Sequence, residues 1–499
     1  MNNLKKFLIP SSLGAFAAFA FTPTYFILAL FVSFPALLFL ISKSESYKQT
    51  FFIGWSFGFG FFLHGLYWIS YALLVDENLF GWLVPFAVTL IPATLAIYIG
   101  ITALVAHPIR KDPLRLILCF TSSWVLIEIL RTSLFTGFPW LALGYSLGAW
   151  LPMVQSASLF GVFGLSMLIL LVSTSPFLLL ARTNRKVFFT YAFVCIFLSI
   201  SNFTYGVWKL ETNKTTFHPQ KIRIVQPNIK QDLKWNKNHR YANLQKLISL
   251  SKSKTNPTYI IWPESALTFS IEDPKVKDLL TPIIPPNSFL LTGAINYKSS
   301  LNKIYVSLLA INSNGVLKAS YDKKHLVPFG EYIPFKDIIP GIHKLTHGLM
   351  DFSKGAAEQN IISSINGPSF RTLICYEAFF PSEILEKTKR PDFLLNIIND
   401  AWYRDSSGPF QHLEMAQFRA IENGLPMVRV ANTGISAILG PQGRIIEKLP
   451  LNKEGYLESF LPKKNLDLTA YSLYGNNILT FLLLSILVAF LPRNSFKYT

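Results

Sequence analysis

The chain has 499 residues, of which 51% are hydrophobic and 15% charged, and its mean hydropathy is +0.36. This composition is too apolar for a wholly soluble protein and too mixed for one that lies wholly in a membrane. The net charge of +18 does not indicate nucleic-acid binding, because the basic residues lie in short loops or are scattered, with no basic stripe interleaved with aromatic residues. We expect a membrane protein with one large polar domain and no nucleic-acid partner.

Eight apolar runs are long enough to cross a bilayer, which takes about 20 predominantly apolar residues. They lie near residues 7–24, 26–42, 51–74, 82–106, 115–132, 155–181, 187–204 and 475–492. Seven of them form a predicted N-terminal membrane domain, residues 1–205, and the eighth forms a C-terminal transmembrane helix. Only a short break at 22–24 separates the first two runs, and counting them as one span would invert the orientation of everything that follows.

The positions of lysine and arginine predict the orientation of these spans, since both residues accumulate in short cytoplasmic loops. Basic residues precede the first span and follow the second, fourth, sixth and eighth: Lys5, Lys6, Lys43, Lys48, Arg110, Lys111, Arg182, Arg185, Lys186, Arg493 and Lys497. The alternate loop at 76–78 contains Asp, Glu and Asn only. Both termini are therefore expected in the cytoplasm, with residues from about 205 to 470 outside it.

The block at 220–465 contains short apolar runs bounded by turn or polar residues, a pattern typical of buried strands. These runs lie at 221–226, 259–262, 289–292, 372–375 and 393–398. Two hairpins are predicted around Asn314-Gly315 and around residues 441–443. Residues 411–423 predict an amphipathic helix that ends at Gly424. The pattern indicates an α/β domain large enough to hold one core.

Cysteine is rare in this chain. Cys119 and Cys195 fall inside predicted spans, where a cysteine behaves as a small buried hydrophobic residue. Cys375 is the only cysteine in the block outside the cytoplasm, so it has no partner there for an internal disulfide. An unpaired thiol in that compartment favours a catalytic role.

Three predicted strands end in side chains of complementary chemistry. Glu264 follows the run Ile-Ile-Trp-Pro, Lys323 follows the first hairpin, and Cys375 closes the run Thr-Leu-Ile-Cys. Because α/β sheets place ligands at strand ends, we expect the three side chains to meet at one rim. A carboxylate, an ammonium group and a thiol at one rim predict an acyl-transfer site.

Each of these groups has a chemical role that suits it. Glu264 is suited to take the thiol proton if partial burial raises its pKa. Lys323 would lower the pKa of Cys375 and, with the N–H of Tyr376, would bind the oxyanion of a tetrahedral intermediate. Glu331 would orient Lys323 as a second carboxylate behind it.

The settings of these residues resemble a known superfamily. The segments WPES, YDKKHLVPFGEYIP and CYE, around Glu264, Lys323 and Cys375, are similar to the Glu-Lys-Cys motifs of the nitrilase or carbon–nitrogen hydrolase superfamily. With membrane spans on both sides of this block, the whole chain resembles the apolipoprotein N-acyltransferases of the Gram-negative inner membrane. The resemblance implies a nitrilase-like α-β-β-α sandwich inserted between seven N-terminal transmembrane helices and one C-terminal one.

The resemblance also implies a reaction in two steps. Cys375 would take an acyl chain from a phospholipid, expected to be phosphatidylethanolamine, and form a thioester. The α-amino group of the S-diacylglyceryl-cysteine of an apolipoprotein would then accept the chain, on the periplasmic side of the membrane. Glu331, Tyr376, Glu377 and Trp235 match positions that support the site in that family. The chemistry needs no cofactor, and the histidines show no metal-ligand spacing with the thiol.

Two other functions stay open at this point. A membrane-tethered amidase would use the same three side chains with water as the acceptor. A transporter or scaffold would need functional polar groups inside the spans, where Glu128 and Arg131, three residues apart on one helix face, are expected to pair with each other. The choice of base also stays open, because Glu377 is a second carboxylate close to the thiol in sequence.

A lipid substrate requires a site that opens at the membrane, since each CH₂ lifted from the bilayer costs about 0.8 kcal/mol. We expect the apolar stretch from residue 343 to 355 to form a mobile lid beside this opening. Arg131, Phe138 and Trp140, in a predicted loop outside the cytoplasm, are expected to line the lipid entrance.

Overall fold

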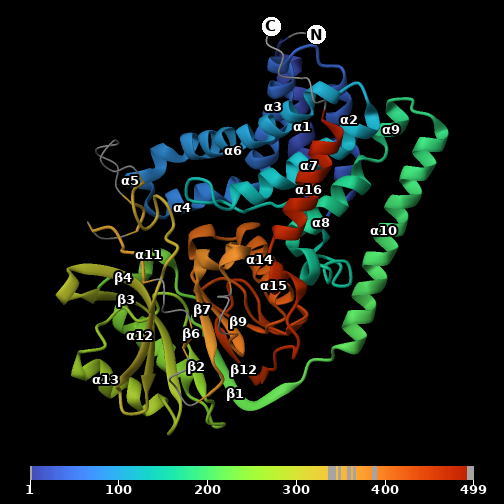
Figure 1. Ribbon diagram of the computed structural model, residues 1–499. Helices are drawn as coiled ribbons and strands as arrows, with labels where there is room; N and C mark the ends of the chain where they lie inside the picture. The colour runs from blue at the N-terminus through green and yellow to red at the C-terminus, as the bar shows by residue number, and fades with distance from the viewer. Residues whose placement is uncertain are drawn as a thin grey trace. The chain divides into compact units, whose positions relative to one another are not determined.

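The computed structural model describes residues 3–334, 344–346, 350–356, 361–362, 367–384 and 390–491. The chain divides into two compact units, of which unit 1 comprises residues 1–70, 82–212 and 469–499, and unit 2 comprises residues 71–81 and 213–468 (Figure 1). Residues 71–81 were predicted to end one span and form the loop after it. In the structure they pack with the polar unit instead.

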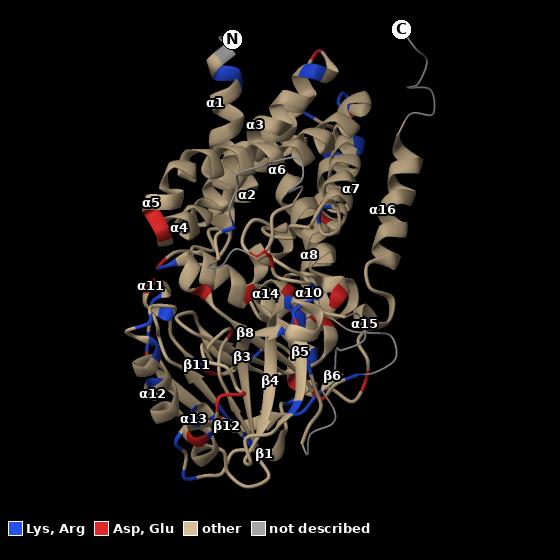
Figure 2. Cartoon of the chain, turned by 90° about the vertical axis from the view of Figure 1, so that its left-hand side faces the viewer, with Lys and Arg blue, Asp and Glu red and all other residues tan. Residues whose placement is uncertain are grey.

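Unit 1 is built of helices. Its main helices are α1 (Asn3–Ala17), α2 (Leu28–Ser42), α3 (Tyr47–Gly65), α6 (Val84–Ala106), α7 (Pro113–Arg131), α8 (Ala157–Thr174), α9 (Phe177–Leu180), α10 (Arg185–Thr212), α15 (Ala470–Tyr474) and α16 (Asn477–Phe490). A helix therefore lies at each predicted span, and α16 packs against α7. Figure 2 shows that charged residues of these helices gather near their ends.

Four stretches of the described chain are long and apolar enough to cross a bilayer: Tyr67–Ile109, Pro113–Arg131, Ala157–Leu180 and Arg185–Thr212. Two other predicted spans, α1 and α2, have 15 residues each. At 1.5 Å per residue, a helix of that length is shorter than a hydrocarbon core about 30 Å thick. The number of helices that cross the membrane thus stays a prediction.

Two charged residues near the end of α7, Glu128 and Arg131, both bind the loop that follows it. Glu128 accepts a hydrogen bond from the N–H of Leu143 at 2.9 Å, and Arg131 donates one to the carbonyl oxygen of Trp140 at 2.7 Å. Trp140 stacks on Phe138, and both Trp140 and Arg131 are buried. Loop groups bind both side chains, and the two opposite charges also attract each other, so the expected pairing is an electrostatic one here. Arg131 and Trp140 thus lie inside unit 1 rather than at an open entrance.

The described residues of unit 2 form two six-stranded sheets, in the orders β12-β1-β2-β3-β4-β5 and β11-β10-β9-β8-β7-β6. Strands β1, β2 and β3 are parallel, as are β7, β8 and β9, while the other pairs are antiparallel. The bounds are β1 Phe217–Gln226, β2 Tyr259–Ile261, β3 Phe289–Lys298, β4 Lys303–Asn312, β5 Leu317–Asp322, β6 Ile361–Ile362, β7 Phe370–Ile374, β8 Phe393–Ile398, β9 Met427–Ala431, β10 Ser436–Leu439, β11 Ile445–Leu449 and β12 Gly455–Pro462. All five predicted strands and both hairpins are confirmed.

Successive side chains along a strand point to opposite faces of its sheet. The apolar residues of unit 2 therefore form three layers, one between the two sheets and one on the outer face of each sheet. In β8, Phe393 and Leu395 enter the core between the sheets, whereas Leu394 packs toward helix α14 (Gly408–Asn423). Helices α12 (Arg240–Ser251) and α13 (Pro274–Leu280) cover the outer face of the other sheet. The unit is therefore an α-β-β-α sandwich, as predicted, with α14 ending at Gly424 in the left-handed conformation.

The first and last strands of unit 2 are neighbours. β12 pairs antiparallel with β1, so that Phe217 lies opposite Pro462 and Gln226 lies opposite Gly455. The chain therefore enters and leaves the first sheet at the same end, and β12 forms one edge of that sheet.

Candidate active site

Glu264 follows β2 in a tight turn. The hydrogen-bond ladder ends where Trp262 donates to the carbonyl oxygen of Leu291, and Pro263 cannot extend it. On the adjacent strand β3, Gly293 leaves space for this turn, since a Cβ there would lie 2.5 Å from the carbonyl oxygen of Pro263. Glu264 is 8% exposed, so it is enclosed rather than presented at an open edge.

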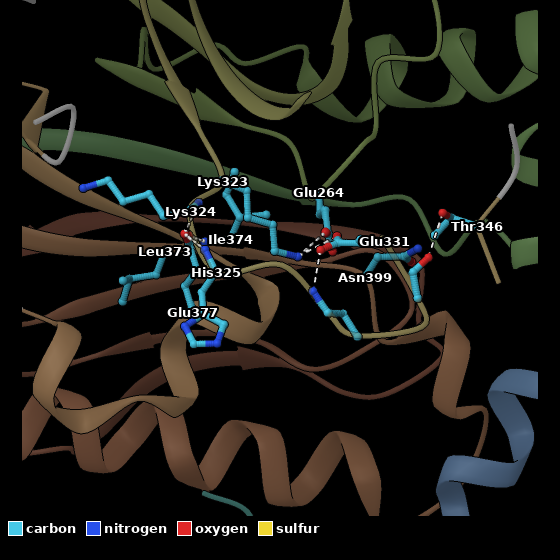
Figure 3. A network of polar contacts seen from close by, with 12 residues as sticks. Glu264, Lys323, Lys324, His325, Glu331, Thr346, Leu373, Ile374, Glu377 and Asn399 are labelled. Carbon is cyan, nitrogen blue, oxygen red and sulfur yellow. Dashed lines mark hydrogen bonds and ion pairs between the residues drawn. The ribbon is translucent and has the colours of Figure 1, made fainter. Parts of the chain in front are cut away.

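Lys323 directly follows β5 and is fully enclosed. Its Nζ lies 2.8 Å from Oε1 of Glu331 and 3.5 Å from Oε1 of Glu264, and the three side chains converge in Figure 3. The second oxygen of Glu331 accepts a hydrogen bond from the N–H of Val327 at 2.8 Å, which fixes the carboxylate. Burial alone would lower the pKa of Lys323, but Glu331 and Glu264 raise it above its usual value. The group is therefore a permanent cation.

Cys375 lies at the start of a turn and not in the strand. β7 ends at Ile374, and Cys375 begins the 3-10 turn η9 (Cys375–Phe379) with a φ of +49°. Non-glycine residues rarely adopt this left-handed conformation, which stores strain on the order of 1–3 kcal/mol and is concentrated at functional sites. The predicted strand at 372–375 is therefore one residue too long, and that residue is the nucleophile candidate.

Burial and the neighbouring charges together set the pKa of the Cys375 thiol. Burial, followed by the negative charge of Glu264, raises the pKa of the Cys375 thiol well above its usual value, while Lys323 opposes this effect. Lys323 thus lowers the pKa of Cys375, as predicted, but its effect is smaller than the opposing effect of burial. Burial also raises the pKa of Glu264, against Lys323. The thiol therefore keeps its proton until a base takes it, and Glu264 is a carboxyl group suited to that task.

Glu377 is saturated by hydrogen bonds. Its Oε1 accepts from the hydroxyl of Tyr321 and the N–H of Lys324, both at 2.7 Å, and from the N–H of His325 at 3.3 Å. Its Oε2 accepts from the N–H of Ile374 at 2.7 Å. The carboxylate therefore links the chain after β5 to the end of β7 (Figure 3). With both oxygens engaged in this way, Glu377 is less suited than Glu264 to act as the base.

Replacing Glu377 with Gln is expected to destabilise unit 2, because the amide would point N–H groups at backbone N–H donors. Unsatisfied buried groups cost about 1–3 kcal/mol each, so we expect a loss of about 2–4 kcal/mol and a melting temperature lower by roughly 4–16 °C. Thermal unfolding of the detergent-solubilised protein measures this. Glu383→Gln is the control, because Glu383 is half exposed and pairs with His325 at the surface. Unfolding of the Glu377 variant at the wild-type temperature would contradict the linking role.

The other predicted site residues have different environments. Tyr376 is buried, and its ring meets the rings of Phe379 and Phe380 edge-on at 5.0 Å. Trp235 follows α11 (Gln231–Lys234) and is half-buried. Among the described residues, its ring takes part in no hydrogen bond or ring stacking, so the contact that brings this part of the chain to the site comes from Lys234. Lys234 was not singled out from the sequence.

Part of the predicted lid at 343–355 lies outside the described residues, namely 343 and 347–349. The part that follows is anchored: the N–H of Phe352 donates to the carbonyl oxygen of Glu331, and the N–H of Gly355 donates to that of Lys323. The Phe352 side chain belongs to the core between the sheets. The mobility of the lid stays a prediction, while in this part the backbone and the aromatic ring are held by these contacts beside Lys323.

A second buried polar network lies behind the thiol. Nδ1 of His412 donates to Asp400 at 2.7 Å, and the other oxygen of Asp400 accepts from Arg429 at 3.1 Å. Burial and then Arg429 lower the pKa of His412 to about 4, so the imidazole is neutral at physiological pH. In the part of the chain that the structure describes, no group of three or more His, Cys, Asp or Glu side chains is placed to hold a metal ion.

The two-sheet sandwich, with a carboxyl group, an ammonium group and a thiol at its strand ends, defines the class of carbon–nitrogen hydrolases. The family model described as carbon-nitrogen hydrolase matches residues 221–471, and the model described as apolipoprotein N-acyltransferase N-terminal domain matches residues 13–175. Proteins named apolipoprotein N-acyltransferase match this chain over both of these regions. The chain belongs to the apolipoprotein N-acyltransferase family.

Three similar proteins carry the name apolipoprotein N-acyltransferase. The one from Rickettsia typhi is 37% identical over 469 residues, 93% of each chain. The one from Rhodopseudomonas palustris is 38% identical over 482 residues, covering 92% of this chain and 90% of its own. The one from Brucella melitensis is 36% identical over 490 residues, covering 93% and 91%. The similarity thus extends over both units.

Two solved structures resemble part of the chain. A CN-hydrolase superfamily protein from Xanthomonas campestris is 17% identical, covers 54% of this chain and 97% of its own, and has a TM-score of 0.37. An amidase from Nesterenkonia sp. AN1 is 18% identical, covers 49% of this chain and 93% of its own, and has a TM-score of 0.36.

Proposed function

We propose that this protein transfers an acyl chain from a phospholipid to the α-amino group of the N-terminal S-diacylglyceryl-cysteine of apolipoproteins, through a thioester on Cys375. The observation that carries the proposal is the enclosed set of Glu264, Lys323 and Cys375 in a chain whose full-length relatives are named for this acyl transfer. This step would complete lipoprotein maturation.

The first half-reaction forms the acyl-enzyme. Glu264 takes the proton of the Cys375 thiol as the sulfur attacks the ester carbonyl carbon of the phospholipid. Lys323 and the N–H of Tyr376 stabilise the negative charge on the carbonyl oxygen. The carbon–oxygen bond of the ester then breaks, and Glu264 returns the proton to the departing lysophospholipid oxygen.

The second half-reaction discharges the thioester. The α-amino group of the apolipoprotein attacks the thioester carbonyl, and Glu264 takes a proton from the nitrogen. The carbon–sulfur bond breaks, and the proton returns to Cys375. Glu264, Lys323 and Cys375 are each at most 8% exposed, so the reaction takes place in an enclosed site. We prefer the acyltransferase to the amidase because relatives that match 92–93% of this chain carry the acyltransferase name.

The proposal places the protein in the bacterial inner membrane as a multi-pass protein. The catalytic unit lies on the periplasmic side and both termini lie in the cytoplasm, in keeping with the distribution of Lys and Arg over the short loops. Phosphatidylethanolamine is the proposed acyl donor, and a diacylated apolipoprotein is the proposed acceptor.

Intact mass spectrometry after incubation with phosphatidylethanolamine tests the mechanism. We expect a mass gain of one acyl group that hydroxylamine removes, that a diacylated lipopeptide discharges, and that Cys375→Ala abolishes. Cys119→Ala is the matched control, because this cysteine lies in α7 and should leave the adduct unchanged. An adduct that water discharges as fast as the lipopeptide would favour the amidase, and a folded protein without any adduct would refute the thioester.

A further inference from the structure

A second buried lysine lies against the catalytic carboxyl group. Lys234 ends the short helix α11, and its side chain is enclosed by the surrounding chain. Its Nζ donates to the main-chain carbonyl oxygen of Glu264 at 3.0 Å. Lys234 and Glu264 also line the same pocket, together with Asn243 and Asn432. Burying an ammonium group is costly unless negative charge compensates it, so this position needs a reason.

A count of the charges in the site provides that reason. Glu331 carries one negative charge, and the 2.8 Å contact with Lys323 neutralises it. Glu264 and Cys375 share a single proton during the reaction, so one of them is negative in each state. Lys323 alone leaves this second negative charge without a balancing cation in an enclosed site, where an unpaired charge is costly. A second cation would balance it both before and after the proton moves.

We infer that Lys234 is this second cation, a positioning residue that holds Glu264 through its main-chain carbonyl and balances the negative charge shared by Glu264 and Cys375. The inference rests on the proposed function of this site. Lys234 then joins Glu264, Glu331 and Lys323 around the thiol, beside the Asp400–Arg429 ion pair, whose two charges balance each other. The net charge of the site stays constant while the proton passes between oxygen and sulfur.

Backbone geometry and electrostatics agree with this role. The residue after Glu264, Ser265, has a φ of +49°, so the carbonyl group that Lys234 binds belongs to a strained turn that needs an anchor. Burial lowers the pKa of Lys234 to about 8, although Glu264 and Cys375 both act to raise it. Lys234 therefore stays mostly protonated at neutral pH. Lys234 and the Cys375 thiol interact electrostatically, and such an interaction is stronger in an enclosed site than in water.

The pH dependence of thiol alkylation tests the inference without acyl transfer. Iodoacetamide labelling of Cys375 is followed by peptide mass spectrometry over a pH series. Replacing Lys234 with Met is expected to slow labelling about tenfold at pH 7 and to shift the profile about one pH unit upward, which corresponds to one unit of pKa. Lys234→Arg keeps the charge and should stay closer to the wild type. Lys237→Met, at an exposed lysine three residues on, should leave the profile unchanged.

Folding and function are separated by two further measurements. Thermal unfolding identifies a variant that does not fold. If Lys234→Met does not fold, Lys234→Gln replaces it, because the amide can keep a hydrogen bond without the charge. The Gln variant should show the same slower labelling and the same upward shift of the pH profile. A wild-type alkylation profile in a folded Met or Gln variant would overturn the inference. If the wild type forms no acyl-enzyme although the alkylation profile shifts as expected, the proposed function fails and the charge role of Lys234 stands.

Discussion

Replacing Glu264 with Gln is expected to slow acyl-enzyme formation by roughly 10²- to 10⁴-fold, the usual contribution of a positioned general base. The amide keeps the size of the side chain but cannot accept the thiol proton. Burial raises the pKa of the Cys375 thiol, so no preformed thiolate replaces the missing base. The rate is measured as the growth of the acyl adduct with time after addition of phosphatidylethanolamine.

The pH profile separates a lost base from a disturbed fold. In the wild type, the rate should rise with pH as Glu264 loses its proton, and burial moves this rise above the ordinary range of carboxyl groups because it raises the pKa. The Glu264→Gln variant should lack the rise. Glu272→Gln, at an exposed carboxyl group, serves as the control. A Glu264 variant with the wild-type rate and profile would exclude Glu264 as the base.

Replacing Lys323 with Met is expected to cost about 3–5 kcal/mol of stability, the range found when one partner of a buried ion pair is removed. Glu331 at 2.8 Å and Glu264 at 3.5 Å would both lose their cation. Acyl-enzyme formation should disappear as well, because the oxyanion loses a donor. For a unit of this size, the stability loss corresponds to a melting temperature lower by roughly 6–20 °C.

The sign of the pH effect distinguishes charge from packing. The pKa of Glu264, already raised by burial, would rise further without Lys323. A carboxyl group whose pKa is raised on folding destabilises the folded state as the pH rises through that pKa, so the Lys323→Met variant should approach the wild type on acidification. Lys318→Met, at an exposed position of β5, is the control. A melting difference that is constant with pH would indicate lost packing instead.

The sandwich was predictable from the sequence because its buried strands are local. Short apolar runs such as 289–292 and 393–398 stand between turn residues, so their type and place follow from periodicity. β12 was not foreseen, since Gly455–Pro462 mixes charged and apolar residues as expected of an edge strand. Its place is decided by pairing with β1, far away in sequence, and no local pattern records that.

The site was predictable in its chemistry and not in its geometry. The residue types and settings of Glu264, Lys323 and Cys375 pointed to thiol chemistry. The left-handed turn at Cys375 is not visible in the sequence, because a cysteine after an apolar run reads as one more strand residue. Lys234 reads as an ordinary surface lysine in a polar segment. Its burial results from the approach of α11 to the turn after β2, which is a tertiary contact.

The pairing of β12 with β1 has a consequence for the order of folding. β1 is the first strand of unit 2 to be synthesised and has a neighbour on each side. The neighbour on its outer side, β12, is the last strand of the unit. Until Gly455–Pro462 has been synthesised, the outer edge of β1 exposes unpaired backbone groups, which can pair with other chains. The nascent domain is thus most prone to aggregation during its own synthesis, and completion of its last strand protects it.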